Sequence, residues 1–152
     1  MLKICQLAKE PWECWRFEEA WVEWNKYQEL PSSIECLTSL DLLTLIDCKN
    51  LVCLPSTICS LKLGNSLDLS RCSKFDNLPK NLGNVKGLEK LDFSGIAIKE
   101  LFSSIECLTN LTVLTLKDCK NLLRLPNSIW SLKFGNSLDL FGCSNLTICQ
   151  RT

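Results

Sequence analysis

Apolar residues between positions 108 and 132 recur at mixed spacings of two, three and four. They are Leu108, Leu111, Leu114, Leu116, Cys119, Leu122, Leu125, Ile129 and Leu132. The alternation of Leu114, Thr115 and Leu116 is typical of a strand, whereas the wider steps on either side suit turns and a short helical return. The stretch therefore predicts a strand, a turn and a return within about two dozen residues.

The same pattern recurs through most of the chain. Successive copies begin at Leu37, Leu61, Val85, Leu108 and Leu132, so their starts lie 24, 24, 23 and 24 residues apart. A longer copy overlies the short one, because residues from Leu30 onward match those from Leu101 at an offset of 71. The predicted fold is an α/β solenoid, a leucine-rich-repeat horseshoe. Its parallel β-sheet should lie on the concave side and short helical or 3₁₀ returns on the convex side.

One leucine-rich-repeat domain should span residues 14–152. Its full coils are residues 37–60, 61–84, 85–107 and 108–131, followed by a partial coil at 132–152. Residues 14–36 match coil 85–107 at the 71-residue offset, which predicts a degenerate first coil. A helix that begins at Pro11 and carries Trp21 and Trp24 on one face is the alternative. Residues 1–13 match no repeat and are unassigned.

Two departures from the repeat lead us to expect local differences in structure. Pro55, Pro79 and Pro126 turn three of the coils, and Phe102 stands in their place in coil 85–107. We therefore expect a looser turn at Phe102, because proline fixes φ. Gly64 and Gly135 occupy positions where other coils have leucine. Each glycine predicts a missing side chain in the ladder of stacked leucines.

Composition and charge narrow the function classes. The formal net charge is zero, which gives no electrostatic support for a nucleic-acid or anionic-membrane partner. No apolar run reaches the length of a membrane span, and the first ten residues are too charged for a secretory signal. We therefore expect a cytoplasmic protein, with the nucleus as a second location, and no nucleic-acid or membrane partner.

The cysteines and carboxylates suggest structural roles. Cys48, Cys72, Cys119 and Cys143 fill one inward repeat position, so we expect reduced, buried thiols. The chain has no histidine and no Cys-x-x-Cys, so we expect no metal site. Asp68, Asp92 and Asp139 recur once per coil with no nucleophile aimed at them. The sequence therefore predicts no enzyme activity and no cofactor.

Outward positions of the predicted strands form three columns. The central column is Trp21, Thr44, Asp68, Asp92, Thr115 and Asp139; the adjacent column is Glu23, Ile46, Ser70, Ser94, Lys117 and Phe141; the third column is Trp24, Asp47, Arg71, Gly95, Asp118 and Gly142. These residues vary, whereas inward positions are nearly uniform leucine. We predict that the central and adjacent columns, from Thr44 to Phe141, bind a protein partner. Unconstrained solvent-facing residues are the alternative.

Several segments resemble a known family. They are Leu-Pro-Ser-Ser-Ile-Glu at 30–35, Asp-Cys-Lys-Asn-Leu at 47–51 and 118–122, Ser-Leu-Asp-Leu-Ser-Arg-Cys-Ser-Lys at 66–74 and Leu-Asp-Phe-Ser-Gly-Ile-Ala-Ile-Lys-Glu-Leu at 91–101. Together they resemble the leucine-rich-repeat region of plant intracellular immune receptors, the disease resistance proteins with a TIR domain and a nucleotide-binding domain. The resemblance covers residues 30–149.

The resemblance implies a role in defence. Such repeats recognise a pathogen effector or a guarded host protein, and they restrain the receptor's own nucleotide-binding domain. The NAD⁺-cleaving activity and the nucleotide-binding loop of the family belong to other domains and are not carried over to these residues. The alternative hypothesis is a truncated repeat fragment that acts only as a structural or adaptor scaffold.

Overall fold

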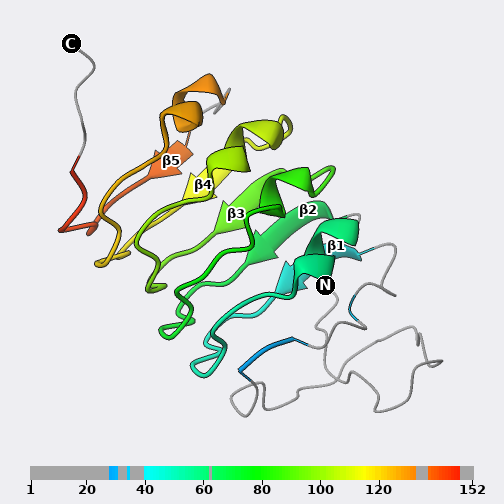
Figure 1. The fold of residues 1–152 in the computed structure, drawn as a ribbon, viewed down its shortest axis with the longest axis horizontal. Coiled ribbons are helices and arrows are strands. Elements are labelled where there is room, and N and C mark those ends of the chain that lie inside the picture. Colours follow the sequence, from blue (N-terminus) through cyan, green and yellow to red (C-terminus); the bar gives the residue numbers. More distant parts are fainter. Residues whose placement is uncertain (1–27, 31–33, 35–39, 62, 133–136, 148–152) are drawn as a thin grey trace.

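The strands of successive coils form one parallel sheet. The computed structural model describes residues 28–30, 34, 40–61, 63–132 and 137–147. Its strands are β1 (Leu40–Thr44), β2 (Leu63–Asp68), β3 (Lys90–Asp92), β4 (Val113–Thr115) and β5 (Ser137–Asp139). They lie side by side in chain order, and each pairs in parallel with the next (Figure 1). The predicted parallel sheet is confirmed, with each strand ending one residue earlier than its leucine pattern indicated.

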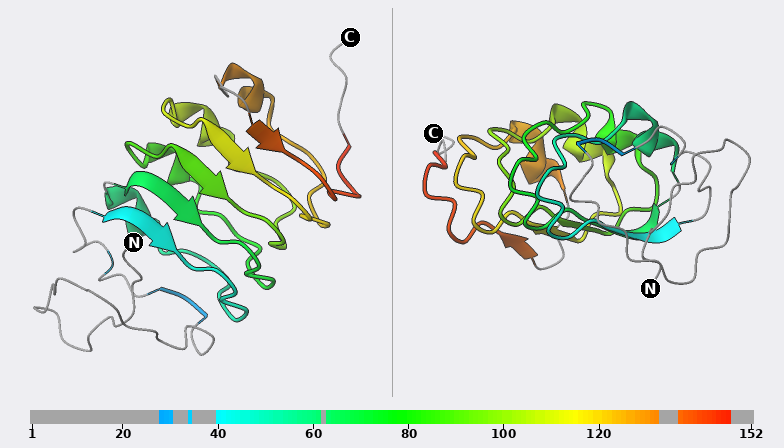
Figure 2. Two further views of the ribbon diagram at one scale, coloured as in Figure 1. Left: turned by 180° about the vertical axis from the view of Figure 1, so that it is seen from behind. Right: turned by 90° about the horizontal axis from the view of Figure 1, so that it is seen from below.

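The returns between strands are short 3₁₀ helices. They are η3 (Ser56–Ser60), η4 (Leu82–Asn84), η5 (Ser103–Cys107) and η6 (Asn127–Ser131). Figure 2 shows them on the side of the molecule opposite the sheet. About two dozen residues per coil leave too little chain for longer helices. The leucine-rich-repeat solenoid predicted from the sequence is confirmed.

The core lies between the sheet and the 3₁₀ helices. Leu43, Leu67, Leu91 and Leu114 are direct register partners in neighbouring strands, and all four are buried. Within the described residues, no polar or charged residue is buried. Because each coil covers its apolar face only with its neighbours, stability is distributed along the stack of coils. The face of the sheet that points away from this core is called the sheet face below.

The turn at Phe102 is not looser than the others. Phe102 has φ −66° and ψ 140°, close to −65° and 149° at Pro55 and to −66° and 146° at Pro126. The expectation of a looser turn is therefore wrong. These dihedrals are open to any residue, and the Phe102 side chain is only 6% exposed. Packing of the ring holds the turn where proline holds it in other coils.

The missing side chain at Gly64 is also a wrong prediction. Leu63, not Gly64, is the partner of Leu40, and Leu63 is fully buried. The register shifts between Leu40 and Leu42, where β2 holds one extra residue, as in a β-bulge. Gly64 is exposed. The bulge thus lets the preceding leucine fill the ladder. Gly135 lies outside the described residues.

Candidate protein-binding surface on the sheet face

The central column is assembled by the strand register. Its described members are direct partners in neighbouring strands, in the order Thr44, Asp68, Asp92, Thr115 and Asp139. All are half-buried, and parallel strands lie about 4.8 Å apart. The structure therefore brings this predicted set together in one row. Trp21, the first predicted member, lies outside the described residues.

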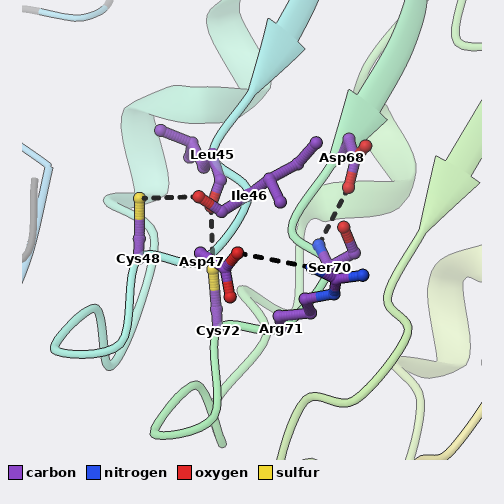
Figure 3. A network of polar contacts seen from close by, with 8 residues as sticks. All are labelled: Leu45, Ile46, Asp47, Cys48, Asp68, Ser70, Arg71 and Cys72. Atoms are coloured by element: carbon purple, nitrogen blue, oxygen red, sulfur yellow. Dashed lines mark hydrogen bonds and ion pairs between the residues drawn. The ribbon is translucent and has the colours of Figure 1, made fainter. Parts of the chain in front are cut away.

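The three aspartates of this column are bound to their own backbone. Asp68 Oδ1 accepts the Ser70 N–H at 2.9 Å (Figure 3), and Asp139 Oδ1 accepts the Phe141 N–H at 2.9 Å. Asp92 Oδ1 accepts both the N–H of Ser94 at 2.9 Å and its hydroxyl at 2.6 Å. Aspartate commonly stabilises a turn by binding a backbone N–H two residues further on. These carboxylates therefore fix the backbone of the adjacent column.

Backbone hydrogen bonds hold the adjacent column from coil to coil. The carbonyls of Ser70, Ser94, Lys117 and Phe141 accept N–H groups of the preceding coil at 3.0, 2.7, 2.8 and 2.7 Å respectively. The side chains remain accessible to different degrees. Ile46 is 46% and Phe141 72% exposed, Lys117 is also exposed, and the two serines are half-buried. The strands end two residues before these positions, so the column lies in the turns that follow the strands, whereas the sequence predicted outward strand positions. It presents varied side chains on a regular backbone. Glu23, its first predicted member, lies outside the described residues.

The most exposed part of the adjacent column is its C-terminal end. The Lys117 ammonium lies 5.6 Å from the centre of the Phe141 ring. A cation this close to an aromatic face is attracted by the ring's electrons. The contact holds a positive charge and a large apolar surface side by side in the turns that follow β4 and β5. An aromatic side chain beside a cation is a common anchor in protein interfaces.

The sequence predicted that the third column consists of outward strand positions. The structure contradicts this prediction. Its described members all have positive φ: Asp47 (61°), Arg71 (63°), Gly95 (71°), Asp118 (57°) and Gly142 (77°). This left-handed conformation suits glycine and is tolerated by aspartate, but it strains other residues. The column therefore marks the turn that follows each strand. Arg71 and Asp47 form an exposed ion pair at 3.5 Å (Figure 3).

The repeated cysteines act as donors beneath this turn. The Sγ atoms of Cys72, Cys119 and Cys143 lie 2.9, 3.0 and 2.9 Å from carbonyl oxygens of the preceding coil. The cysteines at this position are free thiols. Figure 3 shows Cys72 directed at the Leu45 carbonyl. Burial raises the pKa of the Cys119 thiol to about 12, so it stays protonated and can donate. The inward position was read from the sequence, but the donor role was not.

Other features of the described residues lie away from the columns. A hollow of about 780 Å³ is lined by Asp76, Leu101, Phe102, Leu123 and Arg124, among others. The described part of the chain has no group of three or more potential metal ligands. It also has no helix long and apolar enough to cross a membrane.

Comparison with known proteins shows which proteins the chain resembles. No family profile matches it. Over 121 residues, which are 80% of this chain, it is 39% identical to disease resistance protein RPS6 of Arabidopsis thaliana. Over 123 residues, again 80% of this chain, it is 36% identical to the TMV resistance protein N of Nicotiana glutinosa. The chain is homologous to plant disease resistance proteins. The family resemblance drawn from the repeat motifs is thereby confirmed.

The homologous region is one part of much longer relatives. The chain spans about a tenth of their length, 10% of RPS6 and 11% of N. A solved structure of a Leptospira interrogans LRR protein, LIC12759, superposes with a TM-score of 0.53 at 26% identity. That match covers 76% of this chain and 34% of the other. The region shared with the disease resistance proteins is therefore a leucine-rich repeat.

Proposed function

We propose that this chain is a protein-recognition module that serves plant defence and binds its partner through the sheet face. The observation that carries the proposal is the adjacent column. Ile46, Lys117 and Phe141 project from a backbone that the neighbouring coils hold fixed. The homology to disease resistance proteins supports the defence role.

The shape and chemistry of the surface favour a protein over a small molecule. Protein interfaces combine an aromatic or apolar anchor with a polar surround. Phe141 supplies the anchor, and Lys117 with the two serines supplies the surround. The carboxylates of Asp68, Asp92 and Asp139 are engaged by backbone N–H groups, which supports a structural role for them over an acid–base role.

The family resemblance suggests the class of partner. A pathogen effector or a guarded host protein is the partner that such repeats sense. The receptor's own nucleotide-binding domain is the second partner of that kind, contacted in the resting state of a full-length receptor. Both interactions would take place in the cytoplasm or nucleus. Recognition by the exposed adjacent column requires neither a cofactor nor catalysis by this chain.

Proximity labelling tests the proposal in plant cells. The chain is fused to a biotin ligase, and labelled proteins are compared between the unchanged chain and the double variant Lys117→Ala/Phe141→Ala. We expect specific labelled proteins to be lost in the double variant at equal protein level. Trp130→Ala is the matched control, because Trp130 is 52% exposed but lies on η6, opposite the sheet. Loss of labelling in the control with retention in the double variant would refute the sheet face as the binding surface.

A further inference from the structure

Coil 85–107, in the middle of the solenoid, is one residue shorter than the coils on either side of it. The missing residue lies between Ile96 and Leu101, which are five positions apart, whereas the equivalent Cys72 and Leu78 are six apart. This span leads from the turn after β3 to the helix η5, on a flank of the solenoid away from the sheet face. The shortening therefore leaves the strand register intact and changes how the coils meet on this flank.

The short coil interrupts the backbone hydrogen bonds that join the coils there. In the coil that follows, the Leu123 N–H donates to the Lys99 carbonyl at 2.9 Å. The equivalent bond from the Lys99 N–H to the Asp76 carbonyl is not formed, and the Ala97 N–H donates to the Phe75 carbonyl at 2.8 Å instead. Within the described residues, the Lys99 N–H and the Asp76 carbonyl have no partner. A donor and an acceptor therefore stay open side by side in neighbouring coils.

The hollow of about 780 Å³ lies at this interruption, because both open groups belong to residues that line it. Phe102, which replaces the proline of the other coils, lines it as well, and its ring is nearly buried. Leu123 is 50% exposed and supplies the accessible apolar surface of the lining. The Thr147 N–H donates to the Leu123 carbonyl at 2.9 Å. The next coil is thus in place beside Leu123, and the exposure of this side chain does not arise from the end of the chain.

The charges around the hollow favour an acidic ligand. Its charged lining residues are Asp76, Lys80, Lys99, Glu100 and Arg124. Arg124 is already neutralised, because its Nη2 and Nε atoms donate to one oxygen of Glu100 at 2.8 and 3.0 Å. In the described part of the chain, Lys80 and Lys99 form no ion pair. Asp76 is the one carboxylate of the lining that remains to oppose them, so positive charge is in excess.

We propose that this hollow binds an extended segment of a partner protein in which an apolar side chain is flanked by acidic ones. The apolar side chain packs on Leu123, and the carboxylates pair with Lys80 and Lys99. The open Lys99 N–H and Asp76 carbonyl bond the backbone of the segment, as an exposed donor and acceptor of a sheet edge do. Small-molecule sites are enclosed and mostly apolar, whereas most residues that line this hollow are exposed. The contact is separate from the one proposed for the sheet face.

Binding of synthetic peptides to the full chain tests the proposal. The probes are three fluorescein-labelled heptapeptides with a central leucine, flanked on both sides by aspartate, serine or lysine, and their Kd values are measured by fluorescence anisotropy. We expect the aspartate-flanked peptide to bind about tenfold more tightly than the lysine-flanked one. Leu123→Ser should weaken its binding about fivefold, since half of a leucine side chain is no longer covered. Equal binding of the three peptides, or binding of none, would overturn the proposal.

Charge reversal separates recognition at the hollow from damage to the fold. The double variant Lys80→Glu/Lys99→Glu should reverse the preference, so that the lysine-flanked peptide binds more tightly than the aspartate-flanked one. A gain in binding of one peptide is not a consequence of unfolding. Lys86→Glu/Lys120→Glu is the matched control, because it changes the net charge equally at two exposed lysines that do not line this hollow. A preference unchanged in the first variant, or reversed in the control, would contradict the assignment.

A further variant separates this contact from the sheet face. Lys117→Ala/Phe141→Ala, which removes the exposed end of the adjacent column, should bind the aspartate-flanked peptide as the unchanged chain does. Loss of peptide binding in this variant would assign the peptide to the sheet face and refute the hollow as its site. Retained binding together with no effect of this variant on labelled partners would leave the hollow supported and refute the function proposed for the sheet face.

Discussion

Truncating a buried leucine should lower the free energy of unfolding far more in the interior of the solenoid than in its last described coil. Leu116 follows β4, is fully buried and is covered by the coils on both sides. Replacing a buried leucine by alanine costs about 2–5 kcal/mol, from lost transfer energy and from the cavity left behind. We expect about 3 kcal/mol for Leu116→Ala. A domain of this kind is stable by about 5–15 kcal/mol in total, so the loss is easily measured.

Leu140 is the matched comparison, because it holds the same place one coil later and is only half-buried. Less of its side chain is removed from water on folding, and a cavity there opens to solvent. Leu140→Ala should therefore cost about 1 kcal/mol. Thr115→Ala, on the sheet face beside Leu116, should change stability by about 0.5 kcal/mol or less.

Urea unfolding followed by circular dichroism measures the three variants, with the free energy of unfolding obtained by linear extrapolation. The slope of the free energy of unfolding against urea concentration must be compared first, because fraying of the last coil would lower this slope for Leu140→Ala. Equal losses at Leu116 and Leu140 would refute the inference that the burial of each leucine sets the cost of its truncation. Equal losses at Leu116 and Thr115 would refute the inward and outward assignment of the strand residues.

Three further predictions follow from single contacts. Burial raises the pKa of Cys119 from 9.0 to about 12. The contribution of this thiol to stability is therefore complete below pH 9 and is lost as the pH rises toward 12. The midpoint of urea unfolding should fall over this pH range, and it should fall less steeply in Cys119→Ala. Arg71→Gly should unfold with a free energy about 1 kcal/mol higher than Arg71→Ala, because glycine adopts positive φ without strain; equal values would contradict this. Thr115→Asp places a carboxylate between Asp92 and Asp139, and repulsion costs about 0.9 kcal/mol per neighbour in water at low salt. High salt should therefore raise the melting temperature of Thr115→Asp back toward that of the unchanged chain, but it should not do so for Thr115→Asn.

The sequence predicted the fold well because one physical rule repeats in every coil. Leucines spaced by two residues must point to one side of a strand, so Leu43, Leu67, Leu91 and Leu114 define both the strands and their register. The β2 bulge escaped this reasoning. The coil length stays at 24 residues, and the slip from Gly64 to Leu63 happens inside it. A count of residues between repeats does not reveal where within a coil an extra residue lies.

The polar contacts were less visible in the sequence than the core. Alternation assigns a residue to a face, but it does not say what the side chain binds there. The link from Asp92 to the Ser94 N–H depends on turn geometry, as does the thiol of Cys119 beneath the Phe93 carbonyl. One feature of the sequence does indicate this turn geometry. Gly95 and Gly142 occupy the same repeat position, and recurring glycine at the end of a strand is typical of positive φ.

These contacts divide the candidate surface into two parts with different tolerance to change. A substitution at Asp68 or Asp92 removes an acceptor for a backbone N–H, so it alters the turn as well as the surface. The backbone of the adjacent column is held by main-chain bonds that need no particular side chain, such as Gly95 N–H to the Lys117 carbonyl at 2.8 Å. Residues at Ile46, Lys117 and Phe141 can therefore vary with little effect on folding. Substitutions that change partner specificity without loss of the fold should therefore occur in the adjacent column. The central column sets the position of the backbone of the adjacent column.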